Sequence, residues 1–170
     1  NHYPAMKLCC VSLSSRAEGG IVDYGLGDWF DIGPERPGKA QLTSVALSAT
    51  ATYHYLLSTM EQIALHLGRD GDAAHYAELA AKVRKAFNER FYNGGQTVYE
   101  KGSQAGLAMA LYMGLVPPEH RDAALGALVR DIESRGYALT AGDVGFRYVV
   151  QTLQQNGRSD VIYKMNRNPD

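Results

Sequence analysis

Hydrophobic residues recur at helical spacing along most of the chain beyond residue 50. One segment places apolar residues at steps of three and four from Tyr53 to Leu67, and Gly68 follows it. The next runs to Phe87 and begins at Asp72, which we expect to cap its helix. Residues three and four apart lie on one face of an α-helix, so the two segments predict an antiparallel helix pair.

The same spacing predicts four more helices in the second half of the chain. We expect a turn at residues 93–95 and a short strand at residues 97–99 ahead of these four helices. A loop over residues 136–145 separates the second helix from the third. The four segments are Ser103–Met113, Pro118–Ser134, Phe146–Leu153 and Val161–Met165. The pattern therefore predicts an all-α fold with about six helices in antiparallel pairs, as in a toroid, a solenoid or an irregular bundle.

The N-terminal quarter is less regular. Residues 1–18 are mixed and allow a short helix at Ala5–Ser14, whereas residues 19–43 hold many glycines and two prolines. A long loop inside a compact domain is often functional, so we expect residues 19–43 to contribute to a site.

Composition narrows the class of partner. Lys and Arg number 17 and Asp and Glu 18, for a net charge of −1. Nucleic acids and anionic membranes attract basic patches, so neither is an expected partner, while a neutral sugar fits. No apolar run is long enough to cross a bilayer, and no signal peptide is recognisable at Asn1. Because the chain also lacks a Met start, we expect it to be a piece of a longer protein.

The cysteines and histidines predict neither a metal site nor a cofactor. Cys9 and Cys10 are adjacent, which disfavours a disulfide between them, and no His or Cys pair has metal-ligand spacing. We expect both cysteines to pack as small buried residues. His54 is expected to be a hydrogen-bonded structural histidine.

The densest group of chemically useful residues is the loop Asp23–Asp31. It holds the only tryptophan, Trp29, together with three acids and two glycines. An indole packs on the apolar face of a sugar ring, and carboxylates accept hydrogen bonds from its hydroxyls. The alternative is that Trp29 fills the core. Asp143, flanked by glycines, would either touch a ligand or cap the helix that begins at Phe146.

Several motifs, in order along the chain, resemble the α-L-rhamnosidases of glycoside hydrolase family 78. The similar stretches are Tyr24-Gly25-Leu26-Gly27-Asp28-Trp29 with Ile32-Gly33-Pro34, Thr50–Tyr55, Tyr76–Asn88, Ser103-Gln104-Ala105 with Gly114–Pro117, Leu139–Gly142, and Asn156–Asp160. The resemblance implies that residues 1–170 are the central part of one catalytic (α/α)6 barrel domain, with no second domain. It also implies hydrolysis of terminal α-L-rhamnosyl bonds with inversion, and a bacterial periplasmic or extracellular protein.

By the same resemblance, the chain supplies substrate-binding residues but no catalytic ones. The family's general acid is expected upstream and its general base downstream. Trp29 would pack on the ring and 6-methyl group of rhamnose, and Asp28 would orient the site. Gln104, Thr140 and Asp143 are further substrate-binding candidates. The partner would be a rhamnose-containing oligosaccharide or glycoside.

Two other functions remain open at this stage. One is a non-catalytic helical module that binds carbohydrate or protein, and the other is a different (α/α)6 glycosidase or a polysaccharide lyase. If the chain is about half of a closed toroid, it exposes helix faces that normally pack on missing neighbours. We therefore expect self-association through exposed apolar surface.

Overall fold

The computed structural model describes residues 2–167, and almost every element in that range is a helix. A two-residue antiparallel ladder of β1 and β2 is the only sheet among these residues. The elements are α1 (Tyr3–Ser14), α2 (Val45–His66), α3 (Asp70–Phe91), β1 (Tyr92–Asn93), β2 (Val98–Tyr99), α4 (Gln104–Tyr112), a 3-10 turn at Pro118–His120, α5 (Arg121–Ser134), α6 (Phe146–Gln155) and α7 (Ser159–Asn166). The all-α prediction is confirmed.

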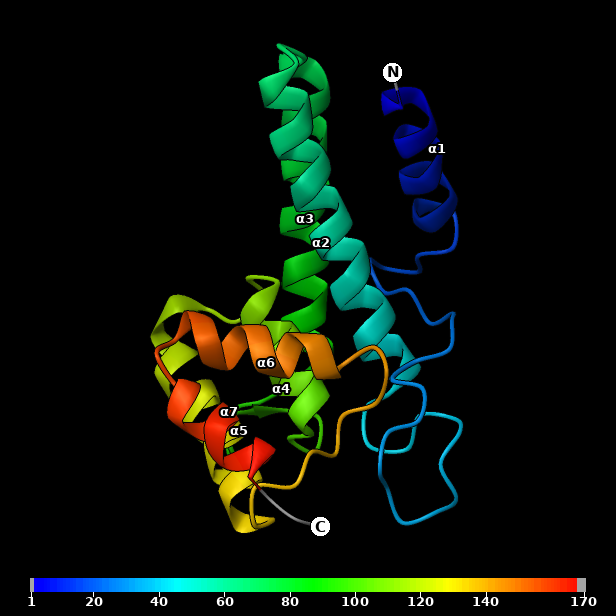
Figure 1. The fold of residues 1–170 in the computed structure, drawn as a ribbon. Coiled ribbons are helices and arrows are strands. Elements are labelled where there is room, and N and C mark those ends of the chain that lie inside the picture. Colours follow the sequence, from blue (N-terminus) through cyan, green and yellow to red (C-terminus); the bar gives the residue numbers. More distant parts are fainter. Residues whose placement is uncertain (1, 168–170) are drawn as a thin grey trace.

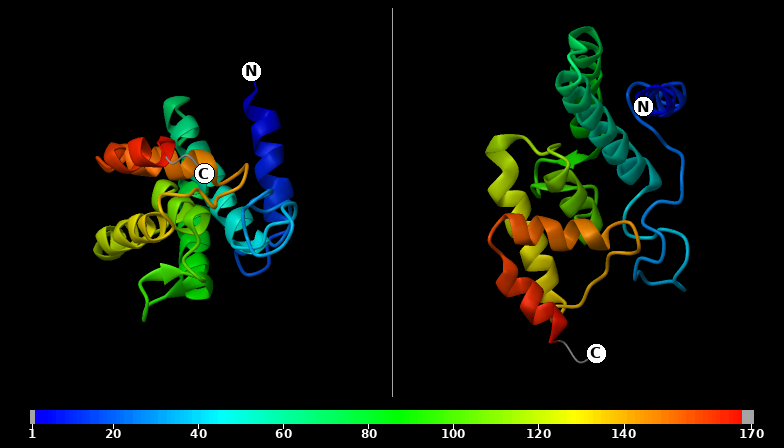
Figure 2. Two further views of the ribbon diagram at one scale, coloured as in Figure 1. Left: turned by 60° about the horizontal axis from the view of Figure 1, so that its bottom comes forward. Right: turned by 45° about the horizontal axis from the view of Figure 1, so that its top comes forward.

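The helices form two layers. Helix α4 packs between α2 and α6, and these three helices make the inner layer (Figures 1 and 2). Each inner helix has an outer partner, with α3 on α2, α5 on α4 and α7 on α6, while α1 lies along the outer side of α2. This alternation of inner and outer helices is the arrangement expected of part of an (α/α)6 barrel.

The long hairpin of α2 and α3 follows from local signals. The Ser44 side chain caps α2 by accepting a hydrogen bond from the Leu47 N–H at 3.0 Å. Gly68, with φ of +64°, reverses the chain after α2 in a conformation that glycine adopts without steric cost. Helix α2 begins earlier than the apolar spacing predicts, because Val45–Thr52 carries small residues that bury without a marked stripe.

The expected cap at Asp72 is wrong. Helix α3 already begins at Asp70, and no side chain caps it. The Asp72 carboxylate instead accepts hydrogen bonds from the Tyr3 hydroxyl at 2.8 Å and the Lys7 ammonium at 2.8 Å. These bonds tie α1 to α3, and the Lys7 charge helps to hold the pKa of Asp72 below its ordinary value.

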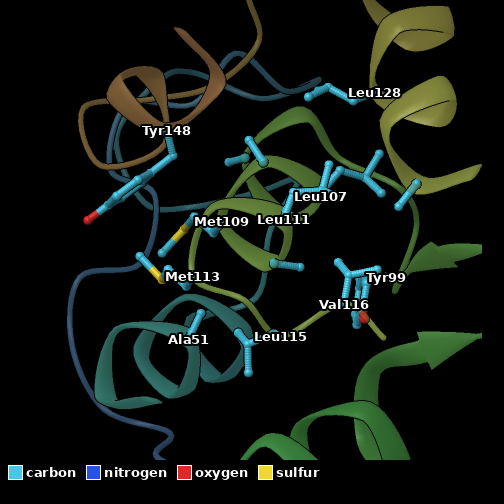
Figure 3. Close-up of a cluster of buried hydrophobic side chains, with 14 of the residues drawn as sticks. Ala51, Tyr99, Leu107, Met109, Leu111, Met113, Leu115, Val116, Leu128 and Tyr148 are labelled. Atoms are coloured by element: carbon cyan, nitrogen blue, oxygen red, sulfur yellow. The ribbon is translucent and has the colours of Figure 1, made fainter. Parts of the chain in front are cut away.

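Helix α4 lies at the centre of the core. All its residues except Tyr112 are buried, and four of them are Ala or Gly, which lets neighbouring helices approach closely. Its side chains Leu107, Met109 and Leu111 meet Ala51 of α2, Leu128 of α5 and Tyr148 of α6 (Figure 3). This packing fixes the inner layer, and with it the positions of the inner-helix N-termini.

The N-terminal ends of the inner helices open on the same side of the molecule. The loop of residues 15–44 precedes α2, the loop of residues 135–145 precedes α6, and the two run side by side in Figures 1 and 2.

Within residues 2–167, no helix has the length and apolar character needed to span a membrane. Cys10 is buried, but Cys9 is exposed, so the expectation that both cysteines pack inside is wrong for Cys9.

Candidate functional site

Two backbone hydrogen bonds join the 15–44 and 135–145 loops. The Asp143 N–H donates to the Trp29 carbonyl at 2.8 Å, and the Ile32 N–H donates to the Thr140 carbonyl at 2.9 Å. The segments that carry the predicted site residues are far apart in sequence. The two bonds nevertheless bring Trp29, Thr140 and Asp143 together at the N-terminal ends of the inner helices.

A buried carboxylate locks this junction. Asp28 has no exposed surface, and its two oxygens accept hydrogen bonds from the N–H groups of Gly142 at 2.8 Å and Gly145 at 2.7 Å. Burial raises the pKa of Asp28 above its ordinary value, and the two backbone donors oppose that rise. We call this arrangement of Asp28, Gly142 and Gly145 the Asp28 clasp.

The clasp requires glycine at both donor positions. A Cβ atom on Gly142 would lie 2.1 Å from the Trp29 carbonyl oxygen and 2.6 Å from the Asp31 nitrogen. One on Gly145 would lie 2.4 Å from the Ala105 Cβ. Atoms do not approach this closely, so only a bare backbone lets the two loops come together.

A second buried carboxylate holds the rest of the loop. Asp31 has no exposed surface and accepts hydrogen bonds from the N–H groups of Gln41 at 2.9 Å and Leu42 at 2.7 Å. Asp31 is one of the three loop acids, and its residue type alone does not indicate this role. A carboxylate that binds backbone N–H groups farther along its own loop depends on how that loop folds.

Trp29 and Phe30 form an aromatic pair on this rigid frame. Their ring centroids are 5.8 Å apart in an edge-to-face arrangement, with Trp29 partly buried and Phe30 exposed. Phe30 has φ of +62°, a left-handed conformation that is strained for an aromatic residue, and its N–H donates to the Gly38 carbonyl at 2.8 Å. Strain of this kind costs about 1–3 kcal/mol and concentrates at functional sites. Phe30 was not singled out from the sequence.

Trp29 therefore does not simply fill the core, which was the alternative interpretation of that residue. An apolar groove of about 340 Å³ lies between α1, α2 and the earlier part of the loop, and neither Trp29 nor Phe30 belongs to its lining. Its lining includes Leu26, Thr52 and Val144, and Tyr24 lies at its edge with the Arg16 guanidinium over its ring. The arrangement offers flat apolar surface beside backbone polar groups, the combination that accommodates a sugar ring.

Gln104 lies behind the site instead of on its surface. Its side chain is fully buried, and its amide nitrogen donates to the Asp131 carboxylate at 3.0 Å and the Ala138 carbonyl at 3.1 Å. Its amide oxygen accepts the Thr140 N–H at 2.9 Å. Every hydrogen of the amide is used, so Gln104 supports Thr140 and has no donor free for a ligand.

The other two predicted substrate-binding residues differ from each other in exposure. Thr140 is buried and joins the two loops through its backbone. Asp143 is exposed, and it does not cap α6, whose first residue Phe146 follows Gly145 without any side-chain cap. Asp143 is thus the one predicted acid at this junction whose carboxylate faces solvent.

His54 lies apart from this site, in the middle of α2. It is buried, and its Nδ1 atom has no hydrogen-bond partner. Burial and the nearby Arg84 charge lower the pKa of His54 to about 4, so the ring is neutral near pH 7. No group of three or more His, Cys, Asp or Glu side chains in residues 2–167 is arranged to hold a metal ion.

The chain is similar to several known α-L-rhamnosidases. An α-L-rhamnosidase of Formosa agariphila is 31% identical over 180 residues, an alignment that covers 99% of this chain and 18% of the relative. The α-L-rhamnosidase of Dictyoglumus thermophilum superposes with a TM-score of 0.88 at 32% identity, over 96% of this chain and 19% of that one. The Streptomyces avermitilis enzyme, solved in complex with L-rhamnose, gives 0.86 at 27% identity, over 99% and 16%.

The chain thus spans less than a fifth of the length of these relatives. The family model for the bacterial alpha-L-rhamnosidase 6 hairpin glycosidase domain matches residues 1–170. The motif resemblance and the assignment to part of an (α/α)6 barrel are both confirmed by these matches. The chain belongs to the family of bacterial α-L-rhamnosidase six-hairpin glycosidase domains.

Proposed function

We propose that this chain forms one wall of the sugar-binding site of a glycoside hydrolase that releases terminal α-L-rhamnose. Residues 1–170 would then be part of a single catalytic barrel domain, and the substrate would be a rhamnose-containing oligosaccharide or glycoside. Membership of the rhamnosidase family supports the reaction class. The site geometry supports the part that this chain takes in it.

The observation that carries the proposal is the Asp28 clasp. In the clasp, a fully buried carboxylate holds two loops in contact. This contact fixes the Trp29–Phe30 pair at the N-terminal ends of the inner helices. Binding groups held in place before the ligand arrives lose less entropy on binding. Trp29 would pack on the apolar face of rhamnose, and the Asp143 carboxylate is exposed where it could accept a hydroxyl.

The same geometry supports a wall without the proton-transfer groups. An inverting glycosidase uses two carboxyl groups, one to protonate the leaving oxygen and one to activate water. Asp28 and Asp31 are fully buried and already accept two backbone N–H groups each. Neither can reach a glycosidic oxygen, and this proposal assigns the exposed Asp143 to a substrate hydroxyl, so the general acid and base would belong to other parts of the catalytic domain.

The test is the Trp29→Ala variant of the full-length protein, assayed with an aryl α-L-rhamnoside. Losing an aromatic platform costs a few kcal/mol, and about 1.4 kcal/mol corresponds to tenfold, so kcat/KM should fall about 10- to 100-fold. Tyr163→Ala is the control, because Tyr163 is an exposed aromatic on α7 whose hydroxyl accepts a hydrogen bond from Arg167 at the end of the same helix. Wild-type kcat/KM in a folded Trp29→Ala protein would remove Trp29 from the site.

A further inference from the structure

We infer that Asp131 and Gln104 are positioning residues that set the placement of Trp29 from the outer helix layer. Asp131 lies on outer helix α5, and Gln104 is the first residue of inner helix α4. Neither residue belongs to the loop that carries Trp29. A continuous series of hydrogen bonds nevertheless connects them to it.

The series begins on α5. The Arg135 guanidinium nitrogen Nε lies 3.1 Å and 3.0 Å from the two oxygens of the Asp131 carboxylate, one helical turn away. The Asp131 side chain is 22% exposed and that of Arg135 is 47% exposed, so the ion pair closes the outer end of the series. Arg135 thereby orients the carboxylate with Oδ2 toward α4.

Gln104 carries the connection through the core. Its amide nitrogen donates one hydrogen to the Asp131 carboxylate and the other to the Ala138 carbonyl, and its amide oxygen accepts the Thr140 N–H. An amide with all three contacts made has a single orientation. An unmade contact would leave a buried polar group unpaired, which disfavours any other arrangement.

Thr140 passes the constraint to the aromatic loop. Its N–H is held by Gln104, and its carbonyl accepts the Ile32 N–H at 2.9 Å, three residues after Trp29. The Asp28 clasp joins the same two loops at a second point, through the Gly142 N–H. The loop is thus held at two points, by the Asp28 clasp and by Gln104 through Thr140.

The importance of this series for catalysis rests on the proposed function, since it assumes that Trp29 contacts the sugar. The positioning itself can be measured without any ligand. Trp29 is the only tryptophan of the chain, so in the 170-residue protein its emission maximum and its quenching by acrylamide report the surroundings of one side chain.

The experiment compares three substitutions on α5. Asp131→Leu removes the acceptor from Gln104, and Asp131→Asn keeps an oxygen in the same place. Asp122→Leu changes an exposed aspartate on the same helix and serves as the control. We expect a red shift and stronger quenching of Trp29 in Asp131→Leu, recovery in Asp131→Asn, and wild-type emission in Asp122→Leu.

Arg135→Leu provides a milder change in case Asp131→Leu does not fold. It removes only the exposed ion pair, and it should shift Trp29 in the same direction by a smaller amount. Wild-type Trp29 emission and quenching in folded Asp131→Leu would overturn the inference. If Asp131→Leu fails to fold, wild-type emission in Arg135→Leu would overturn it.

A second measurement separates this inference from the proposed function. In the full-length protein, a misplaced Trp29 should lower kcat/KM for an aryl α-L-rhamnoside about 10- to 100-fold, because small displacements of binding groups have large kinetic effects. A shifted emission with unchanged kcat/KM would support the positioning role and count against the sugar contact of Trp29.

Discussion

Gly142→Ala is the sharpest test of the contact between the two loops. The added methyl group would lie 2.1 Å from the Trp29 carbonyl oxygen, 2.6 Å from the Asp31 nitrogen and 2.9 Å from the Asp28 carbonyl oxygen. All three are backbone atoms, so no side chain can rotate away. The loops must therefore separate by about 1 Å, which is the usual consequence of overpacking a close contact.

That separation removes identifiable hydrogen bonds. The Gly142 N–H bond to the Asp28 carboxylate and the Asp143 N–H bond to the Trp29 carbonyl both lengthen. A bond to a charged group contributes about 1.5–3 kcal/mol and a neutral one about 1 kcal/mol. We expect Gly142→Ala to lower the free energy of unfolding by about 3 kcal/mol, measured by urea denaturation of the chain.

Gly71→Ala is the matched control because it makes the same chemical change in a different setting. A Cβ atom at Gly71, in the first turns of α3, meets no other atom within 4 Å. Alanine in a helix is favoured over glycine by about 0.5–1 kcal/mol, so this variant should gain stability. If Gly142→Ala cost less than about 1 kcal/mol, the close contact of the two loops would be wrong.

Three further predictions follow from the charges and exposed surface. Because the pKa of His54 is about 4 in the folded chain and 6.5 ordinarily, the unfolded state takes up its proton first as pH falls. The free energy of unfolding should therefore fall by roughly 3 kcal/mol as the pH is lowered from 6.5 to 4. An equally steep fall in the His54→Gln variant would refute the lowered pKa of His54. The isolated chain should not hydrolyse an aryl α-L-rhamnoside, since the reaction needs two carboxyl groups and, of Asp28, Asp31 and Asp143 at the loop junction, only Asp143 is exposed; turnover within about tenfold of the full-length protein would contradict this. Exposed apolar side chains such as Leu26 and Phe146 should make the isolated chain self-associate and bind a hydrophobic dye, whereas a monomer without dye binding would count against it.

Much of the fold was predictable because helices leave local marks. The apolar spacing of Tyr53–Leu67 and the glycine after it indicate a helix and its end, and the structure has both. Asp72 shows the limit of local reasoning. Its sequence position suits a cap, yet α1 packs beside it and supplies Tyr3 and Lys7 as better partners. A tertiary contact of that kind leaves no signal in neighbouring residues.

The site was only partly predictable. Trp29 and Asp28 stood out because an indole, acids and glycines in one loop suit a sugar, and both lie at the loop junction. Phe30 did not stand out, because its exposure depends on a left-handed backbone conformation that only the folded loop imposes. Gln104 was expected to contact the substrate, but the amide is enclosed by partners from α5 and the 135–145 loop.

The sequence by itself determined the helices, the loops between them, and the family through an ordered set of motifs. These depend on residues close together in the chain, which share a helix face or a turn. Only the tertiary structure decided that Asp28 would meet Gly142 and Gly145, more than 110 residues later. Those bonds form because α4 packs between α2 and α6 and brings their N-terminal loops together. The role of each polar residue was settled by which backbone groups it found there.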